Sequence, residues 1–131
     1  MILKSLLFVL IVLFAALSSA AAQENSRLCA LTRAFECGVN GECGELTIEE
    51  MALPRFVRLD LKQNVIVSLD KRVQREDTRI ARVQDLGQTT VLQGIEQRGW
   101  SIALGKETGT LTLSAAGDGH GFIVFGVCMN P

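Results

Sequence analysis

The chain has 131 residues, of which 48% are hydrophobic, and this size and composition correspond to one small domain. Its 13 Lys and Arg and 14 Asp and Glu give a formal net charge of −1. A nucleic-acid-binding domain is expected to be strongly basic, so the charge balance argues against nucleic acid as a partner.

Residues 1–22 have the pattern of a secretory signal peptide, in which Lys4 precedes an apolar run over 6–17 and small residues follow. The run is shorter than the ~20 residues of a spanning helix, so we predict cleavage after Ala22 rather than a membrane anchor. Cleavage removes Lys4 and changes the net charge from −1 to −2. We therefore expect 23–131 to form a single domain that is periplasmic or extracellular and has no membrane span.

The four cysteines predict two disulfides, because small exported domains use cysteine mostly in this way. Cys37 and Cys43 bracket an Asn-Gly turn signal, which can bring their sulfurs together. This pairing leaves Cys29 with Cys128, and that bridge would join the first strand to the last. A zinc site is the alternative, but no C-x-x-C motif is present, so we expect neither a metal nor another cofactor.

Alternating apolar patterns predict β-strands along the whole domain. The expected strands lie at 28–37, 55–61, 65–69, 79–83, 89–96, 100–104, 109–114 and 121–128, and the last four form a meander with glycine-bearing turns. The final run is apolar on both alternating faces, which is typical of a strand covered on both sides.

Two segments between the strands have other patterns. Thr47 and Glu50 fit a capping box, which predicts a short helix over 48–52 that Pro54 must end. Residues 70–78 are highly charged and lack apolar periodicity, so we expect a solvated connection or a hairpin tip. Together these patterns predict an all-β fold, a small antiparallel barrel or sandwich of seven to eight strands with at most one short helix.

Several motifs of the domain resemble small exported bacterial β-proteins of unassigned function. They are Cys29-x7-Cys37-x5-Cys43, Leu53–Asp60, Arg98–Ser101, Glu107–Thr112 and Gly121–Cys128. The resemblance begins at about Arg27 and implies an extracytoplasmic location and a compact β fold, but no active site. A weaker likeness is to periplasmic lysozyme inhibitors, which are small disulfide-tied β-barrels. A Ser-Gly-x-Arg-Tyr-like loop is missing and the chain has no tyrosine, so this likeness concerns architecture alone.

The sole histidine, His120, lies close to Asp118 in the glycine-rich segment 117–121. Histidine is the side chain most suited to proton transfer near neutral pH, and it is a common metal ligand. However, a zinc site needs three or four protein ligands, and a serine nucleophile is expected in a motif such as G-x-S-x-G, which the sequence lacks. We favour a flexible turn and retain Asp118 and His120 as a candidate functional loop.

Arginines supply a second candidate site. If the strands that carry Arg58, Arg79 and Arg82 are neighbours, their guanidinium groups could form an anion-binding face for a glycan, a lipid headgroup or an acidic protein. Cross-strand ion pairs are the simpler interpretation, and we favour it. Trp100, the only tryptophan, could be a ligand platform but is more simply a core residue.

The sequence therefore predicts an exported binding protein without enzymatic activity, an interaction or inhibitor module for an unidentified protein or envelope component. The alternative is a carrier that holds a small molecule or lipid inside the barrel. A cavity distinguishes the two, because a filled barrel has no pocket of the ~300 Å³ that small ligands occupy.

Overall fold

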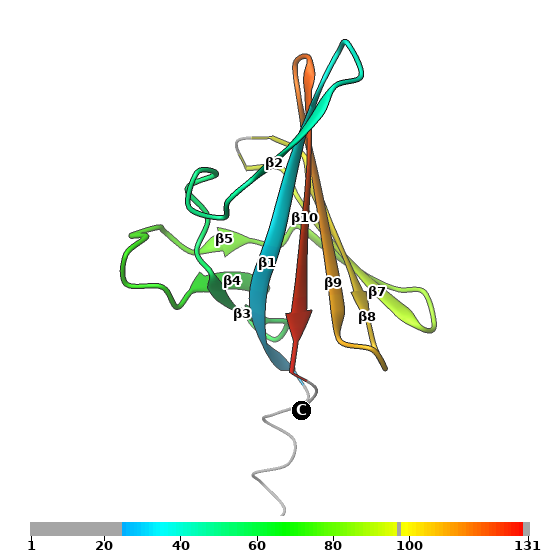
Figure 1. Ribbon diagram of the computed structural model, residues 1–131. Helices are drawn as coiled ribbons and strands as arrows, with labels where there is room; N and C mark the ends of the chain where they lie inside the picture. The colour runs from blue at the N-terminus through cyan, green and yellow to red at the C-terminus, as the bar shows by residue number, and fades with distance from the viewer. Residues whose placement is uncertain (1–24, 97, 130–131) are drawn as a thin grey trace, which may run out of the picture.

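A computed structural model describes residues 25–96 and 98–129, and the expected signal peptide lies outside these ranges. The described residues form one antiparallel sheet that is curled into a half-barrel, and they include no helix (Figure 1). The ten strands are β1 (Ser26–Gly38), β2 (Cys43–Leu46), β3 (Phe56–Asp60), β4 (Val65–Ser68), β5 (Thr78–Arg79), β6 (Arg82–Asp85), β7 (Thr89–Gly94), β8 (Trp100–Gly105), β9 (Thr110–Gly117) and β10 (His120–Cys128). The prediction of an all-β antiparallel fold is confirmed.

The two longest strands, β1 and β10, form the centre of the sheet (Figure 1). The strand order is β5-β4-β3-β1-β10-β9-β8-β7-β6, so β1 joins the first half of the chain to the meander formed by β7 to β10. On its other edge β1 pairs first with β3 and then, nearer its end, with β2. The predicted meander is confirmed.

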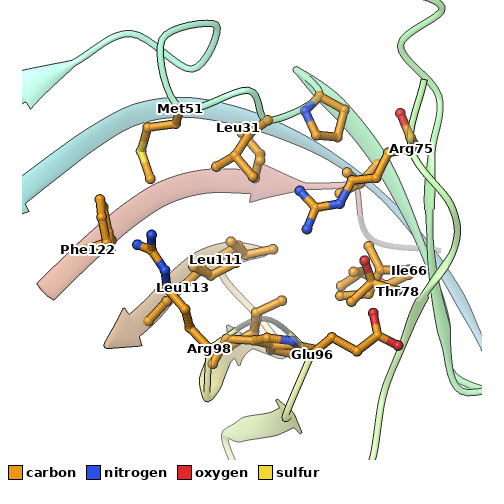
Figure 2. A pocket seen from close by; sticks show the side chains of 18 of the residues that line it. Leu31, Met51, Ile66, Arg75, Thr78, Glu96, Arg98, Leu111, Leu113 and Phe122 are labelled. Atoms are coloured by element: carbon orange, nitrogen blue, oxygen red, sulfur yellow. The ribbon is translucent and has the colours of Figure 1, made fainter. Parts of the chain in front are cut away.

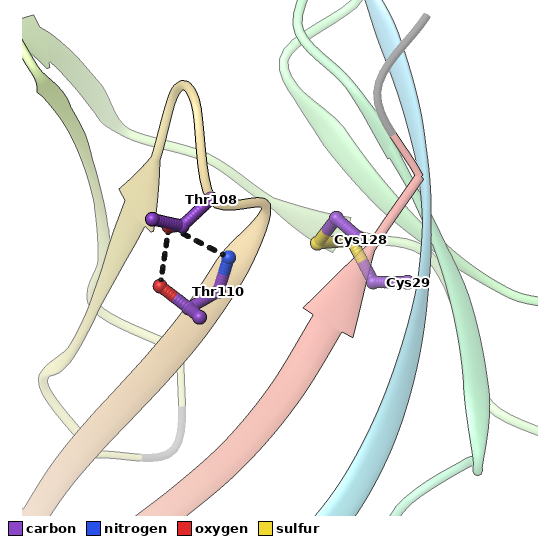
Figure 3. The surroundings of a disulfide bond; sticks show 4 residues. All are labelled: Cys29, Thr108, Thr110 and Cys128. Carbon is purple, nitrogen blue, oxygen red and sulfur yellow. Dashed lines mark hydrogen bonds between the residues drawn. A yellow bond between two sulfur atoms is a disulfide. The ribbon is translucent and has the colours of Figure 1, made fainter.

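The disulfides have the predicted pairing, Cys29–Cys128 and Cys37–Cys43. Cys29 and Cys128 are register partners on β1 and β10, so the bridge connects the first strand directly to the last. The amide of Cys128 also donates a hydrogen bond to the carbonyl of Gly109, 2.7 Å away, which fixes the β8–β9 turn beside this end of the sheet. Figure 3 shows the bridge and the hydrogen bonds between Thr108 and Thr110 in that turn. The other bridge closes the β1–β2 hairpin, where Gly41 has the positive φ of 80° that its turn requires.

One short segment links the two edges of the curled sheet. β5 pairs with β4 and β6 pairs with β7, and only Ile80 and Ala81 separate β5 from β6. The amide of Ile80 donates to the carbonyl of Asn64 and the amide of Ala81 donates to that of Gln93, so the link is bonded to both edges. The result is a half-barrel rather than two stacked sheets.

The pairing register of the strands places the inward side chains of β1 and of β7 to β10 in rows across the sheet. One inward row consists of the buried Ala34, Val124, Ile102 and Leu92 and the partly buried Leu113, with Leu46 of β2 beside Ala34. A β-bulge between Leu31 and Arg33 allows both Leu31 and Ala34 to be buried although they are three residues apart. The bulge also explains why the apolar alternation expected for 28–37 is interrupted at Arg33.

Three expectations from the sequence are wrong. The sheet has ten strands rather than seven or eight, because the Ile80–Ala81 link divides the expected strand at 79–83 and because β2 was not foreseen. The helix expected over 48–52 is only a turn. Its capping box forms, with the Thr47 amide bonded to Glu50 and the Glu50 amide to the Thr47 hydroxyl, but Ala52 already has a positive φ of 53°.

The third wrong expectation concerns β10, which is covered on one side only. Phe122, Val124 and Gly126 face the interior, whereas the alternating apolar residues lie on the outer surface. Ile123, Phe125 and Val127 are 39%, 40% and 53% exposed, respectively. The half-barrel has a single curled layer among the described residues, so there is no second layer to cover the outside of β10.

We expect the two disulfides to contribute unequally to stability, because the entropy that a cross-link removes from the unfolded chain grows with the loop it closes. Cys29 and Cys128 are 99 residues apart, whereas Cys37 and Cys43 are six apart. The double variant Cys29→Ala/Cys128→Ala should lower the free energy of unfolding by about 4 to 5 kcal/mol, and Cys37→Ala/Cys43→Ala by about 2. Urea denaturation would measure both, and equal losses would contradict the expectation.

Candidate functional site

A cavity of about 410 Å³ lies inside the curl of the sheet (Figure 2). Its lining combines apolar side chains from both halves of the sheet with charged side chains. The apolar residues are Leu31, Leu46, Met51, Leu53, Pro54, Val57, Leu59, Ile66, Trp100, Ile102, Leu111, Leu113, Ala115 and Phe122, and the charged ones are Glu36, Glu50, Arg75, Glu76, Glu96 and Arg98. An apolar cavity with a few polar groups is the usual form of a small-molecule site.

One row of inward side chains borders the cavity, and small residues in this row leave space there. This row, the rim row, consists of Glu36, Phe122, Ala115, Trp100 and Gly94, which are register partners across β1, β10, β9, β8 and β7. The Trp100 indole lies against Gly94, where any side chain would meet its ring. Trp100 is thus packed against the core, as the simpler interpretation expects, and it also lines the cavity, where a role as a ligand platform stays a prediction.

Two arginines extend toward the cavity, and neither was among the site residues predicted from the sequence (Figure 2). Arg75 comes from the β4–β5 connection and Arg98 from the β7–β8 connection. The Arg98 guanidinium lies over the ring of Phe122, 4.7 Å from its centroid, which holds it at the rim row. Nothing in the local sequence pattern distinguishes these arginines, because both lie in irregular segments whose position depends on the curl of the sheet.

The carboxylates around the cavity mostly have partners already. A Glu36 oxygen lies 3.0 Å from Nδ1 of His120, and Glu96 accepts a hydrogen bond from the Arg79 amide. Glu50 accepts one from the Thr47 amide, and this bond is the main reason why the pKa of Glu50 is lowered. These three carboxylates therefore support the local backbone or the histidine.

The β4–β5 connection, which carries Arg75, is organised by the carboxylate of Asp70. Asp70 accepts hydrogen bonds from the amides of Arg72 and Arg55 and from the Arg72 side chain. These bonds, the Arg72 amide first, lower the pKa of Asp70. The predicted connection at 70–78 is confirmed apart from Thr78, which belongs to β5, and it is anchored where the sequence suggested only a solvated loop.

His120 pairs with Glu36 rather than with Asp118. Its ring also stacks against that of Phe122, and the described contacts of His120 include no hydroxyl or thiol that could act as a nucleophile. Glu36 was missed because the β1–β10 register brings it close to His120 across 84 positions of sequence. Within the described ranges, no group of three or more His, Cys, Asp and Glu side chains could hold a metal ion.

The three arginines proposed as an anion-binding face lie on strands that do not pair with one another. Arg58 is on β3 and Arg79 on β5, with β4 between them, whereas Arg82 is on β6, which pairs with β7. The neighbouring-strand condition is therefore not met. An anion-binding role for these residues stays a prediction.

A second apolar feature lies on the outside of the sheet. A groove of about 460 Å³ there has an almost entirely apolar lining, which includes Leu28, Phe56, Leu69, Val127 and Met129. All five of these side chains are at least 44% exposed. Apolar patches of this kind are common at protein interaction sites.

The comparisons with known proteins yielded no match to this chain, whether among protein-family models, curated proteins or solved structures. In the described part of the chain, no helix has both the length and the apolar character required to cross a membrane. The two disulfides are typical of an oxidising environment.

We expect Gly94→Ala to displace Trp100, because the new methyl group would overlap the indole ring. The variant should lose about 1 to 3 kcal/mol of unfolding free energy and change its tryptophan emission. Gly99→Ala is the matched control, since a methyl group there meets nothing within 4 Å. Urea denaturation followed by fluorescence would measure both, and a Gly94→Ala protein with unchanged emission would contradict the packing described.

Protonation of Asp70 should loosen the β4–β5 connection. The pKa of Asp70 is lower in the folded protein than its ordinary value of 3.8, so its contribution is complete above that value and is lost as the pH falls through the lower folded pKa. The wild type should therefore lose stability below about pH 4 more steeply than Asp70→Asn. Urea midpoints measured from pH 7 to pH 2 would show this, with Asp77→Asn as the control that follows the wild type.

Proposed function

We propose that this protein binds a small, largely apolar ligand in the interior of the half-barrel and acts as a carrier or binding protein rather than as an enzyme. The observation that carries the proposal is the cavity of about 410 Å³, which exceeds the ~300 Å³ lower bound typical of ligand pockets. The sequence favoured an interaction or inhibitor module and treated a carrier as the alternative. The cavity reverses this preference.

The distribution of polarity supports a ligand with two unlike ends. Buried leucine, isoleucine and valine side chains form the inner lining, where Leu59, Leu111 and Ile102 are at most 2% exposed. The exposed arginines and glutamates of the lining lie where the cavity meets solvent. An apolar chain would gain free energy by leaving water for the inner lining, while a polar end group could stay near the charged side chains.

The disulfides and the signal-like N-terminal segment support action outside the cytoplasm, in the periplasm or the extracellular space. A protein that carries an apolar molecule through an aqueous compartment needs a shielded interior and a fold that resists opening. The Cys29–Cys128 bridge at the centre of the sheet contributes to the second requirement.

A second candidate function is a protein-binding module, and the apolar outer groove favours it. Leu28, Phe56 and Val127 expose about half of their surface there. Binding through this face would not need the interior cavity. Filling the cavity therefore separates the two functions.

The test is Ala115→Phe, which places a ring in the rim row between Trp100 and Phe122. We expect the variant to bind the neutral fluorescent probe N-phenyl-1-naphthylamine at least about tenfold more weakly than the wild type, because the ring occupies the space of the ligand. The control is Ala103→Phe, the same change at an exposed position on β8 that is outside the cavity lining. Circular dichroism should show both variants folded. Equal binding by all three proteins, or no binding by the wild type, would contradict the proposal.

A further inference from the structure

The charged side chains around the cavity differ in whether other protein groups already bind them. Those without such partners remain available to a ligand. Arg75 makes no ion pair with any described residue, and the Arg98 guanidinium lies over the face of the Phe122 ring. A guanidinium that stacks on a ring still has its N–H donors in the plane of the group. Figure 2 shows the Arg75 guanidinium pointing into the cavity and that of Arg98 lying beside Phe122.

The carboxylates are less available. Glu36, Glu50 and Glu96 accept hydrogen bonds or ion pairs from the protein itself, as described above. Among the described residues Glu76 is the one lining carboxylate without such a partner, and it follows Arg75 in the sequence. Each of the other three glutamates has one bond of this kind, whereas no ion pair with a described carboxylate engages the charged donors of Arg75 and Arg98.

From the position of these two guanidinium groups at the cavity we infer that the ligand is a single-chain amphiphile whose polar end is a carboxylate, bound by Arg75 and Arg98. The inference rests on the proposed function, since it names the class of ligand for the same cavity. Planar guanidinium groups match a carboxylate with two parallel N–H···O bonds, and such charge-assisted bonds are about twice as strong as neutral ones. A carboxylate at the edge of an apolar cavity needs partners of this kind, because desolvating it without them is costly.

The size of the cavity limits the ligand to one short chain. A water molecule occupies about 30 Å³ in the liquid, so the cavity has room for on the order of ten groups of water or methylene size. A medium-length monocarboxylate fits this limit. A lipid with two long acyl chains does not.

The test compares three probes with the same ten-carbon chain and different end groups: decanoate, decanol and the decyltrimethylammonium ion. The full chain is expressed in an exporting host, purified with its disulfides formed and titrated by calorimetry. Decanoate should bind about tenfold more tightly than decanol, because charge-assisted hydrogen bonds contribute only for the anion. Arg75→Gln and Arg98→Gln should each weaken decanoate binding by about five- to tenfold and leave decanol binding within about twofold.

Lys62→Gln is the control, because it removes one positive charge from an exposed position outside the cavity lining. It should bind all three probes as the wild type does. Decanol serves as the internal control for the packing role of Arg98, since a collapsed rim row would weaken both probes equally.

Three other binding results would each overturn the inference, and they differ in what they imply for the proposed function. Equal binding of decanoate and decanol by the wild type would show an apolar cavity without anion selectivity, and the proposed function would stand. Tighter binding of decyltrimethylammonium, lost in Glu76→Gln, would assign the polar site to the carboxylate instead. Failure of all three probes to bind would remove the proposed function together with the inference.

Discussion

The pairing of β1 with β10 is the constraint on which the rest of the structure depends. Each of the other strands reaches the sheet through one of these two, β2 to β5 through β1 and β6 to β9 through β10. Forming this pair means bringing together residues about 100 positions apart, and the entropy cost of closing a loop rises with its length. The Cys29–Cys128 bridge lies in the ladder itself and removes that cost from the unfolded chain.

The cavity follows from unequal filling of the space that the curled sheet encloses. Toward the Cys29–Cys128 end, inward positions carry large aliphatic side chains such as Leu59, Leu104 and Leu111, all at most 2% exposed. The rim row has glycine and alanine at two of its five positions, and its tryptophan lies flat against the glycine. Protein interiors are otherwise densely packed, and the space left inside the curl, from the rim row to Leu59 and Leu111, is the basis of the proposed binding role.

Local signals in the sequence predicted most of the strands and the Cys37–Cys43 disulfide, because period-two alternation and an Asn-Gly turn act over few residues. The Cys29–Cys128 disulfide followed only as the remaining pair. What they could not predict depends on which strands become neighbours. The apolar outer face of β10 has the same sequence pattern as a covered strand, and only the single-layer architecture exposes it. Glu36 meets His120, and Arg98 meets Phe122, through ladders between distant strands, so no sequence spacing could reveal the site.

The charges of the cavity lining show why the number of charged residues alone is a poor guide to a ligand. Four glutamates and two arginines line it, which by simple addition would favour a cation. However, a carboxylate that already accepts a backbone amide or pairs with a histidine has part of its field compensated and its best lone pairs occupied. Among the described residues neither arginine has an ion-pair partner, and a stacked ring leaves the in-plane donors of Arg98 free. The chemistry of the site is therefore set by the groups whose bonding capacity the fold leaves open.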